Sequence, residues 1–178
     1  MRRYHLIFPF LFFLYSCATV EQPPEQDIAE ETEVVDEQRP EWYDYSNRSY
    51  ADSLSFVGVG LASSVDSNTA QEQAMKQAEA NLRYAIDIYA EEIRSELAER
   101  PGGGEFSSAS FIINLRNTVQ NLILEDDMET TSEHVEKSDS VHHIYIKVLI
   151  SRQSAIRALD EALQNDAFSN ALNEKEVL

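Results

Sequence analysis

Cys17 is the only cysteine of this 178-residue chain, and it follows a short apolar stretch at the N-terminus. Arg2 and Arg3 precede this stretch, which runs from Leu6 to Leu14 and is too short to cross a bilayer as a helix. A positive start, a short apolar run and a small residue at the cut are typical of an export signal. A thiolate at this place is a good nucleophile and can be converted into a lipid thioether. We therefore predict lipid attachment at Cys17.

Four consecutive residues resemble the lipobox of bacterial lipoproteins: Leu14, Tyr15, Ser16 and Cys17. A branched apolar residue stands three places before the cysteine and a small one directly before it, although Tyr15 is bulkier than usual. The resemblance implies that residues 1–16 are removed as a signal peptide and that Cys17, carrying acyl chains such as palmitate, begins the mature chain. The residue directly after the cysteine is Ala18 rather than Asp, and by the usual sorting rule for such lipoproteins this implies passage to the outer membrane. The alternatives are an ordinary buried cysteine and an uncleaved anchor helix.

The charge of the chain limits its partners. The sequence holds 14 basic and 32 acidic residues, a formal charge of −18, and loss of Arg2 and Arg3 with the signal peptide makes this −20. Such a chain repels nucleic acid and anionic lipid. We therefore expect attachment to the membrane through the acyl chains on Cys17 and work on a protein partner. Without a second cysteine, the mature chain forms no internal disulfide.

Composition divides the rest of the chain. Residues 17–39 are rich in Glu, Gln, Pro, Asp and Thr, which predicts an acidic disordered tether. As a flexible coil it would span about 25 to 30 Å. We expect a single domain over residues 40–164 and a flexible tail over 165–178. Trp42, the only tryptophan, lies where order begins, and covering an edge of the core is favoured over stacking on a ligand.

Glycine and alanine patterns predict a close helix–strand contact. A strand is expected over residues 55–62, where two glycines alternate with apolar residues: Phe56, Val57, Gly58, Val59, Gly60 and Leu61. Glycines in a strand indicate that another backbone or a helix approaches closely. A long helix is expected from an N-cap at Asp66 or Ser67 to Glu99, with small residues first on its inward stripe: Ala70, Ala74, Ala78, Leu82, Ala85, Ile86, Tyr89, Ile93 and Leu97. The alanines let this helix lie beside the glycines.

The remaining elements complete an α+β fold. A second helix is expected over residues 108–124, forming a hairpin with the first across one sheet face. Strands are expected over 128–136 and 141–150, joined by a turn at 138–140. A final helix follows, capped by Ser154 and burying three apolar residues: Ile156, Leu159 and Leu163. The predicted fold is a three-stranded, mainly antiparallel sheet packed against a long and a second helix, in the order β-α-α-β-β-α.

The expected hairpin has a definite register. An odd-length turn pairs Met128 with Ile150 and Thr130 with Val148 on the covered face. The same register places Glu133 beside Tyr145, and Thr131 beside Lys147, in solvent. A slip by one residue would turn the charges inward instead. We expect the polar strand over 128–136 to lie at the edge of the sheet, where charges discourage pairing with other chains.

This order of elements, behind a lipobox and an acidic segment, resembles the LPP-twenty family of bacterial surface lipoproteins and the related flagellar assembly lipoproteins. The run from Pro40 and Trp42 through 56–62 to the alanines at 70, 74 and 78 carries the resemblance, and residues 144–148 match its closing hairpin. It covers most of residues 40–160. It implies no catalytic residues and a role as an envelope, adhesive or flagellum-associated component.

Residues for other chemistry are few. A G-x-G sequence at Gly58 suggests a dinucleotide turn, but Ser63 replaces the third glycine and no second parallel strand ending in an acidic residue follows. The best metal-ligand candidates lie on one hairpin: Glu133, His134, Glu136, His142 and His143. Alternation sends the last two histidines to opposite faces, which favours plain surface histidines. Asp126 and Asp127 oppose a helix dipole and indicate a cation, a basic partner or simply a solvated helix end. We expect no bound metal, no cofactor and no catalytic activity.

Two functions are compatible with the sequence. The first is a non-enzymatic envelope lipoprotein that serves as a structural, assembly or scaffold component, with a flagellar setting as one form of it. Its sheet face or edge strand would bind an envelope partner by strand addition, or would form rings by self-association. The alternative is a small-ligand or regulatory module that activates a peptidoglycan-synthesis enzyme, with a cleft between the first strand and the helices. No polar cluster converges around Gly58 and Gly60, which favours the first.

Overall fold

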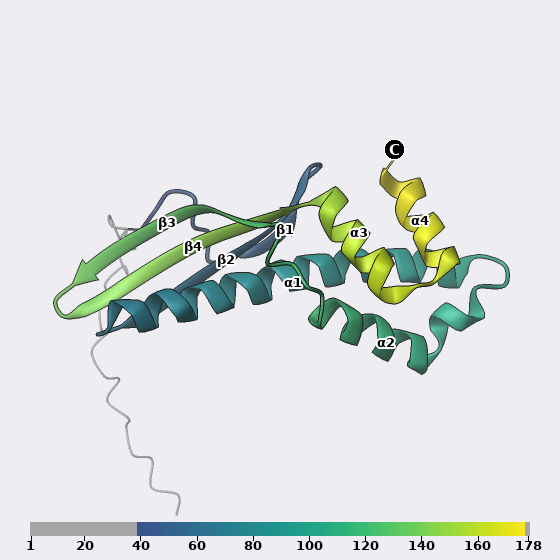
Figure 1. Ribbon diagram of the computed structural model, residues 1–178, viewed down its shortest axis with the longest axis horizontal. Coiled ribbons are helices and arrows are strands. Elements are labelled where there is room, and N and C mark those ends of the chain that lie inside the picture. The colour runs from purple at the N-terminus through teal and green to yellow at the C-terminus, as the bar shows by residue number, and fades with distance from the viewer. Residues whose placement is uncertain (1–38, 177–178) are drawn as a thin grey trace, which may run out of the picture. The chain divides into compact units, whose positions relative to one another are not determined.

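The computed structural model describes residues 39–176 (Figure 1). The described residues all belong to the compact unit Glu37–Leu178. Its elements follow in chain order: β1 (Ser49–Ala51), β2 (Ser55–Ser64), α1 (Ser67–Glu99), the 3-10 helix η1 (Gly103–Ser107), α2 (Ala109–Gln120), β3 (Met128–Ser138), β4 (Val141–Ser151), α3 (Arg152–Leu163) and α4 (Asp166–Glu176).

The sheet is antiparallel and four-stranded, in the order β1-β2-β4-β3. The α+β class is therefore confirmed, but the expected three strands were one too few. The missed strand, β1, has only three residues, too short for alternation to mark it. A turn at Asp52 fixes its pairing with β2, because the Asp52 carboxylate accepts hydrogen bonds from the amides of Leu54 (2.8 Å) and Ser55 (2.7 Å).

Helix α1 lies directly on β2, as the glycines predicted. A Cβ on Gly58 would come within 2.1 Å of the carbonyl oxygen of Ala78, and one on Gly60 within 2.0 Å of that of Ala74. Both alanines are fully buried. Only a residue without a side chain on the strand, facing one with a single methyl group on the helix, permits this approach. Asp66 caps α1 by accepting from the Thr69 amide at 2.8 Å, which confirms one of the two expected caps.

The C-terminal half of α1 lies beside the other helices (Figure 1), although its Tyr89 still contacts Phe56 of β2. Helix α2 packs against α1, as the expected hairpin requires, but its other contacts are with η1 and α3, so the expected position of α2 across a sheet face was wrong. The expected flexible tail over 165–178 also differs from the structure, which forms α4 there. Phe168 and Leu172 of α4 are buried against the main core, and this burial holds the helix in place.

The β3–β4 hairpin has two registers joined by a bulge. Met128 pairs with Ile150 and Thr130 with Val148, as expected. After the bulge at residue 131 the pairing shifts by one, so the expected pairing of Glu133 with Tyr145 was wrong. The cause is the turn, which contains two residues rather than three, since Ser138 pairs directly with Val141. Asp139 has a φ of 55°, which suits such a tight turn.

The start of α3 also differs from the expectation. Ser151, not Ser154, is the N-cap, and its hydroxyl accepts a hydrogen bond from the Ser154 amide at 3.0 Å. The expected inward residues Ile156 and Leu159 are buried in the main core. Strand β4 therefore passes into α3 without an intervening loop. This direct junction fixes the direction of α3 relative to the sheet.

Candidate functional site

Strand β3 forms a long open edge of the sheet. The strand order places it outermost, and it pairs with β4 alone (Figure 1). Its length, Met128–Ser138, is 11 residues, or about 35 Å of extended backbone. An edge strand presents a row of N–H and C=O groups that are free to pair with another chain. The position expected for this polar strand is confirmed.

The bulge determines which side chains of β3 face α1. The hydroxyl of Thr131 donates to the carbonyl oxygen of Lys147 at 3.3 Å, which fixes the extra residue. Beyond it, Glu133 lies opposite Ile146 and Val135 opposite Ile144, both on the sheet face that α1 covers. The slip therefore turns Glu133 toward the helix. It remains exposed there and accepts weak hydrogen bonds from the side chain of Gln71 at 3.4 Å.

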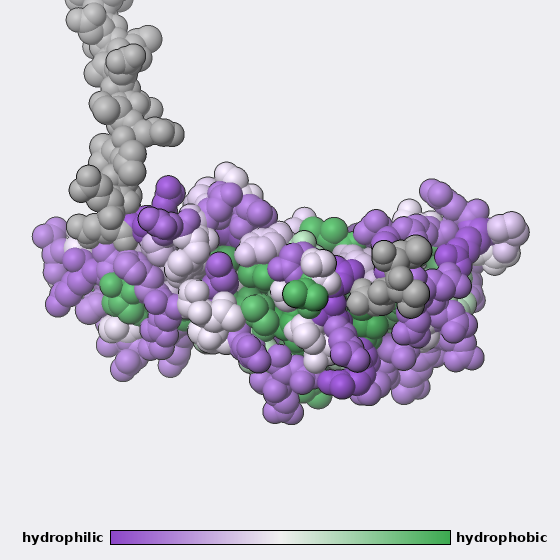
Figure 2. All heavy atoms as spheres, turned by 90° about the horizontal axis from the view of Figure 1, so that it is seen from above, coloured by the Kyte–Doolittle hydropathy of each residue, from purple (hydrophilic) through white to green (hydrophobic). Residues whose placement is uncertain are grey.

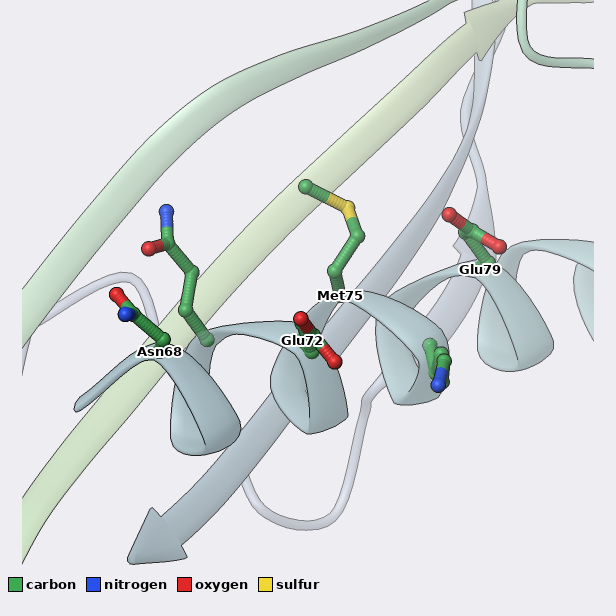
Figure 3. Close-up of a pocket in the computed structure, with 6 residues that line it drawn as sticks. Asn68, Glu72, Met75 and Glu79 are labelled. Atoms are coloured by element: carbon green, nitrogen blue, oxygen red, sulfur yellow. The ribbon is translucent and has the colours of Figure 1, made fainter. Parts of the chain in front are cut away.

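A groove of ≈ 530 Å³ runs along the flank of α1 near β3. Its lining comes entirely from the first half of α1: Asn68, Gln71, Glu72, Met75, Lys76 and Glu79. Figure 3 shows the side chain of Met75 extending from the helix toward the strands, between Glu72 and Glu79. Met75 packs against the main core. The groove therefore combines an apolar centre with charged margins.

The edge and the groove together carry a negative charge. Strand β3 contributes Glu129, Glu133, Glu136 and Lys137, and the groove contributes Glu72, Lys76 and Glu79. Carboxylates thus outnumber ammonium groups by five to two. The end of the domain formed by the β3–β4 hairpin is mostly hydrophilic on the face shown in Figure 2, apart from one small apolar spot. Charge at this edge discourages unspecific pairing and attracts a segment of opposite sign.

The other edge of the sheet, where β2 extends beyond β1, is closed by side chains of α1. Strand β1 covers only part of β2, and beyond it the Asn81 amide donates to the carbonyl oxygen of Val59 at 2.7 Å. The Leu61 amide donates to the side-chain oxygen of Gln77 at 2.8 Å. These bonds occupy backbone groups that a further strand would need. Within the described residues, β3 is thus the longer and more open of the two sheet edges.

The reverse face of the sheet holds a second core that was not predicted from the sequence. Tyr43, Val57, Val59 and Tyr145 are buried there, and Trp42 packs against them. The rings of Tyr43 and Tyr145 meet edge to face with centroids 4.9 Å apart, and the Lys147 ammonium lies 5.1 Å from the centre of the Trp42 ring. Trp42 thus covers apolar surface, as expected. Burial raises the pKa of Tyr43, and the neighbouring Arg48 opposes this effect.

A second hollow, of ≈ 370 Å³, is bounded by β1, α1, Arg152 at the start of α3 and Lys175 in α4. The Arg152 guanidinium lies 4.5 Å from the centre of the Tyr89 ring and donates to the Asp52 carbonyl oxygen at 3.1 Å. Lys175 forms ion pairs with Glu92 (2.9 Å) and Glu96 (2.6 Å). Both cations therefore already hold elements of the fold together. The cleft expected beside Gly58 and Gly60 is filled by the backbone of α1.

The candidate metal ligands do not converge. Over residues 39–176 no group of three or more His, Cys, Asp or Glu side chains could hold an ion. The Nδ1 atom of His143 lies 2.7 Å from the Ser63 hydroxyl, and the ring of His134 lies tilted beside that of Tyr145, with centroids 5.8 Å apart. Asp127, which follows Asp126 in the sequence, forms an ion pair with Arg157 at 3.1 Å. A neighbouring helix thus supplies the basic partner of this carboxylate.

The predicted functional residues are distributed unevenly over the structure. The lipobox residues, Leu14, Tyr15, Ser16 and Cys17, lie outside the described residues. Gly58, Gly60, Ala74 and Ala78 are brought together, and Ala70 is buried on the same helix. Trp42 lies apart, in the second core. The signal for that core was present in β2, where the residues between the glycines, Val57, Val59 and Leu61, are all apolar.

Comparisons with known proteins add no relative. No protein-family model matches the chain, and no curated protein or solved structure is significantly similar to it. None of the helices between residues 39 and 176 has the length and apolar character needed to span a bilayer.

Proposed function

We propose that this chain is a lipid-anchored, non-enzymatic envelope lipoprotein that acts as a structural, assembly or scaffold component through protein–protein contacts. The observation that carries the proposal is the long open edge of β3 beside the groove of α1. The lipobox-like sequence ending at Cys17 supports the anchor and an outer-membrane location. The resemblance to the LPP-twenty family supports an envelope or flagellum-associated setting.

The β3 edge suits strand addition. A partner segment in extended form would pair its backbone with β3, and its alternate side chains would fall on the two sheet faces. One set would reach the groove beside Met75 and the other would lie near His134 and Glu136. Backbone pairing supplies affinity in this mode, and the side-chain contacts supply specificity.

Photo-cross-linking in the intact envelope tests the interaction. A photoreactive residue at Val135, which is 50% exposed on β3, is compared with one at Ile113, which is 60% exposed on α2. We expect a discrete cross-linked product with one partner protein from position 135 and none from position 113. Identical products from the two positions, or none from either, would show that β3 is not the contact surface.

Metabolic labelling with palmitate tests the anchor. The native chain should incorporate the label and be shortened by removal of residues 1–16, whereas Cys17→Ala should remain an unlabelled precursor. A thiol is required for the lipid thioether, and no other cysteine can replace it. Labelled palmitate in the Cys17→Ala protein would refute the assignment.

The hollow bounded by β1, α1, α3 and α4 favours a second candidate, a small-ligand or regulatory module that activates a peptidoglycan-synthesis enzyme. Tyr50, Ile88 and Glu92 line it together with two cations, so polar and apolar groups from four elements meet there. A ligand of this hollow would raise the melting temperature of the protein. Peptidoglycan stem peptides should then raise it for the native chain and not for Ile88→Glu. No shift with any stem peptide would count against this candidate.

A further inference from the structure

We infer that the occupant of the β3 edge and the adjoining groove is a basic, extended segment of a partner protein. This inference rests on the proposed function and specifies the chemistry of the partner. The bulge at Thr131 interrupts the edge, so the regular part available for pairing is residues 132–138. A partner strand of about seven residues matches this length at about 3.4 Å per residue.

The side chains along this part of β3 alternate between two environments. Glu133, Val135 and Lys137 oppose residues on the face that α1 covers, and His134 and Glu136 oppose Tyr145 and His143 on the reverse face. An added strand would continue both rows. On the α1 side, its residues would approach Val135, Met75 and the carboxylates of Glu72 and Glu79. A sequence that alternates apolar and basic residues would place its basic row on one face and its apolar row on the other, and both faces hold a glutamate of β3.

Charge disfavours two other possible occupants of the β3 edge. A second copy of the chain would bring another β3 with the same glutamates, from a protein with a formal charge of −18. Residues 21–37 of the chain itself contain no Lys or Arg and many Asp and Glu. Like charges placed directly opposite each other are destabilising, and both occupants are therefore disfavoured. A cationic segment instead gains affinity from the edge and groove, where five carboxylates outnumber two ammonium groups.

Defined peptides test the inference on the full-length chain in detergent. The probe is a fluorescent seven-residue peptide of alternating Lys and Val, and its binding is followed by anisotropy. A peptide with Glu in place of Lys tests the charge, and the Lys peptide with a central proline tests backbone pairing, because proline removes a donor. We expect binding of the first peptide alone, weakened by salt. Hydrogen exchange should show new protection of amides in residues 132–138.

Matched charge reversals locate the site. Glu133→Lys with Glu136→Lys should weaken the Lys peptide about tenfold, because these residues lie on opposite faces of β3, so that one of them turns from attraction to repulsion whichever face the Lys row takes. The control is Glu99→Lys with Glu161→Lys, which makes the same change of charge at exposed positions on α1 and α3. It should leave the affinity within about twofold. Equal loss in both double variants, or equal binding of the proline peptide, would show unspecific electrostatic attraction and overturn the inference.

The inference and the proposed function can fail separately. Discrete cross-linking at Val135 without any binding of the Lys peptide would retain the scaffold function and reject a basic strand as its partner. Peptide binding without cross-linking in the envelope would support the surface chemistry and reject the proposed function. Increased mass of the full-length chain in light scattering, lost in the Glu133→Lys and Glu136→Lys variant, would assign β3 to self-association and overturn the inference.

Discussion

Replacing Gly58 with alanine tests the contact on which the fold depends most directly. The new Cβ would lie 2.1 Å from the Ala78 carbonyl oxygen and 2.4 Å from the Leu82 amide nitrogen, where ordinary contacts are 3.4 Å or more. Both are backbone atoms, so no rotamer change relieves the overlap and α1 must move outward by about 1 Å, against a core that is densely packed. Overpacking costs about 1–3 kcal/mol. We expect the upper end, about 3 kcal/mol, partly offset by about 0.4–1 kcal/mol from the less flexible unfolded chain.

Urea unfolding measures this loss, with Gly104→Ala as the matched control. Gly104 has no heavy atom within 4 Å of an added Cβ, so the control keeps the chemical change and removes the overlap. We expect a lower midpoint for Gly58→Ala at an unchanged slope, and an unchanged or slightly higher midpoint for Gly104→Ala. Gly60→Ala together with Gly58→Ala should cost less than the sum of the single changes, because both displace the same helix. Equal midpoints for Gly58→Ala and Gly104→Ala would refute the close-contact reasoning.

Three further expectations concern other parts of the domain. Phe168→Ala should lower the free energy of unfolding by about 3–5 kcal/mol, because this fully buried ring joins α4 to the core. A loss of less than about 1 kcal/mol in urea unfolding would show that α4 is only loosely docked. Hydrogen bonds from the Leu54 and Ser55 amides lower the pKa of Asp52. The Asp52 carboxylate therefore stabilises the fold above the ordinary Asp pKa of about 4, and this contribution is lost as the pH falls below that value. Asp52→Asn should reduce the acid sensitivity, and an identical pH profile of melting temperature in the two proteins would contradict this expectation. Deletion of Thr131 should keep the pairing of Ser132 with Lys147 and make the β3 edge continuous. We expect the deletion variant to bind the Lys peptide more tightly. Loss of the folded state would instead show that the fold requires the bulge.

Local patterns in the sequence predicted the elements whose residues interact with near neighbours. The alternation in β4, the alanine stripe of α1 and the glycines of β2 each have a short period or a distinct volume. They therefore predicted α1, both strands of the hairpin and the close approach of α1 to β2. The open edge at β3 could also be predicted, because its polar residues suit a strand with a neighbour on one side only.

Short or weakly periodic segments could not be predicted in this way. Strand β1 is held by its turn and by β2, and α4 by the burial of Phe168 and Leu172. Neither segment carries enough local signal, since a three-residue strand has no period and a single helix turn of apolar residues also occurs in loops. Trp42 was assigned to a core edge, but the second core on which it packs needs residues far apart in sequence, such as Val57 and Tyr145.

The sequence alone determined the lipobox-like segment, the acidic charge and the glycine–alanine contact, because each depends on residue type and spacing along the chain. The tertiary structure decided which charges of β3 face the groove. The two-residue turn at Asp139 imposes one register and the pairing at Met128 the other, and the bulge at Thr131 absorbs the difference of one residue. That competition involves both ends of the hairpin at once, so no local pattern could show that Glu133 turns toward α1.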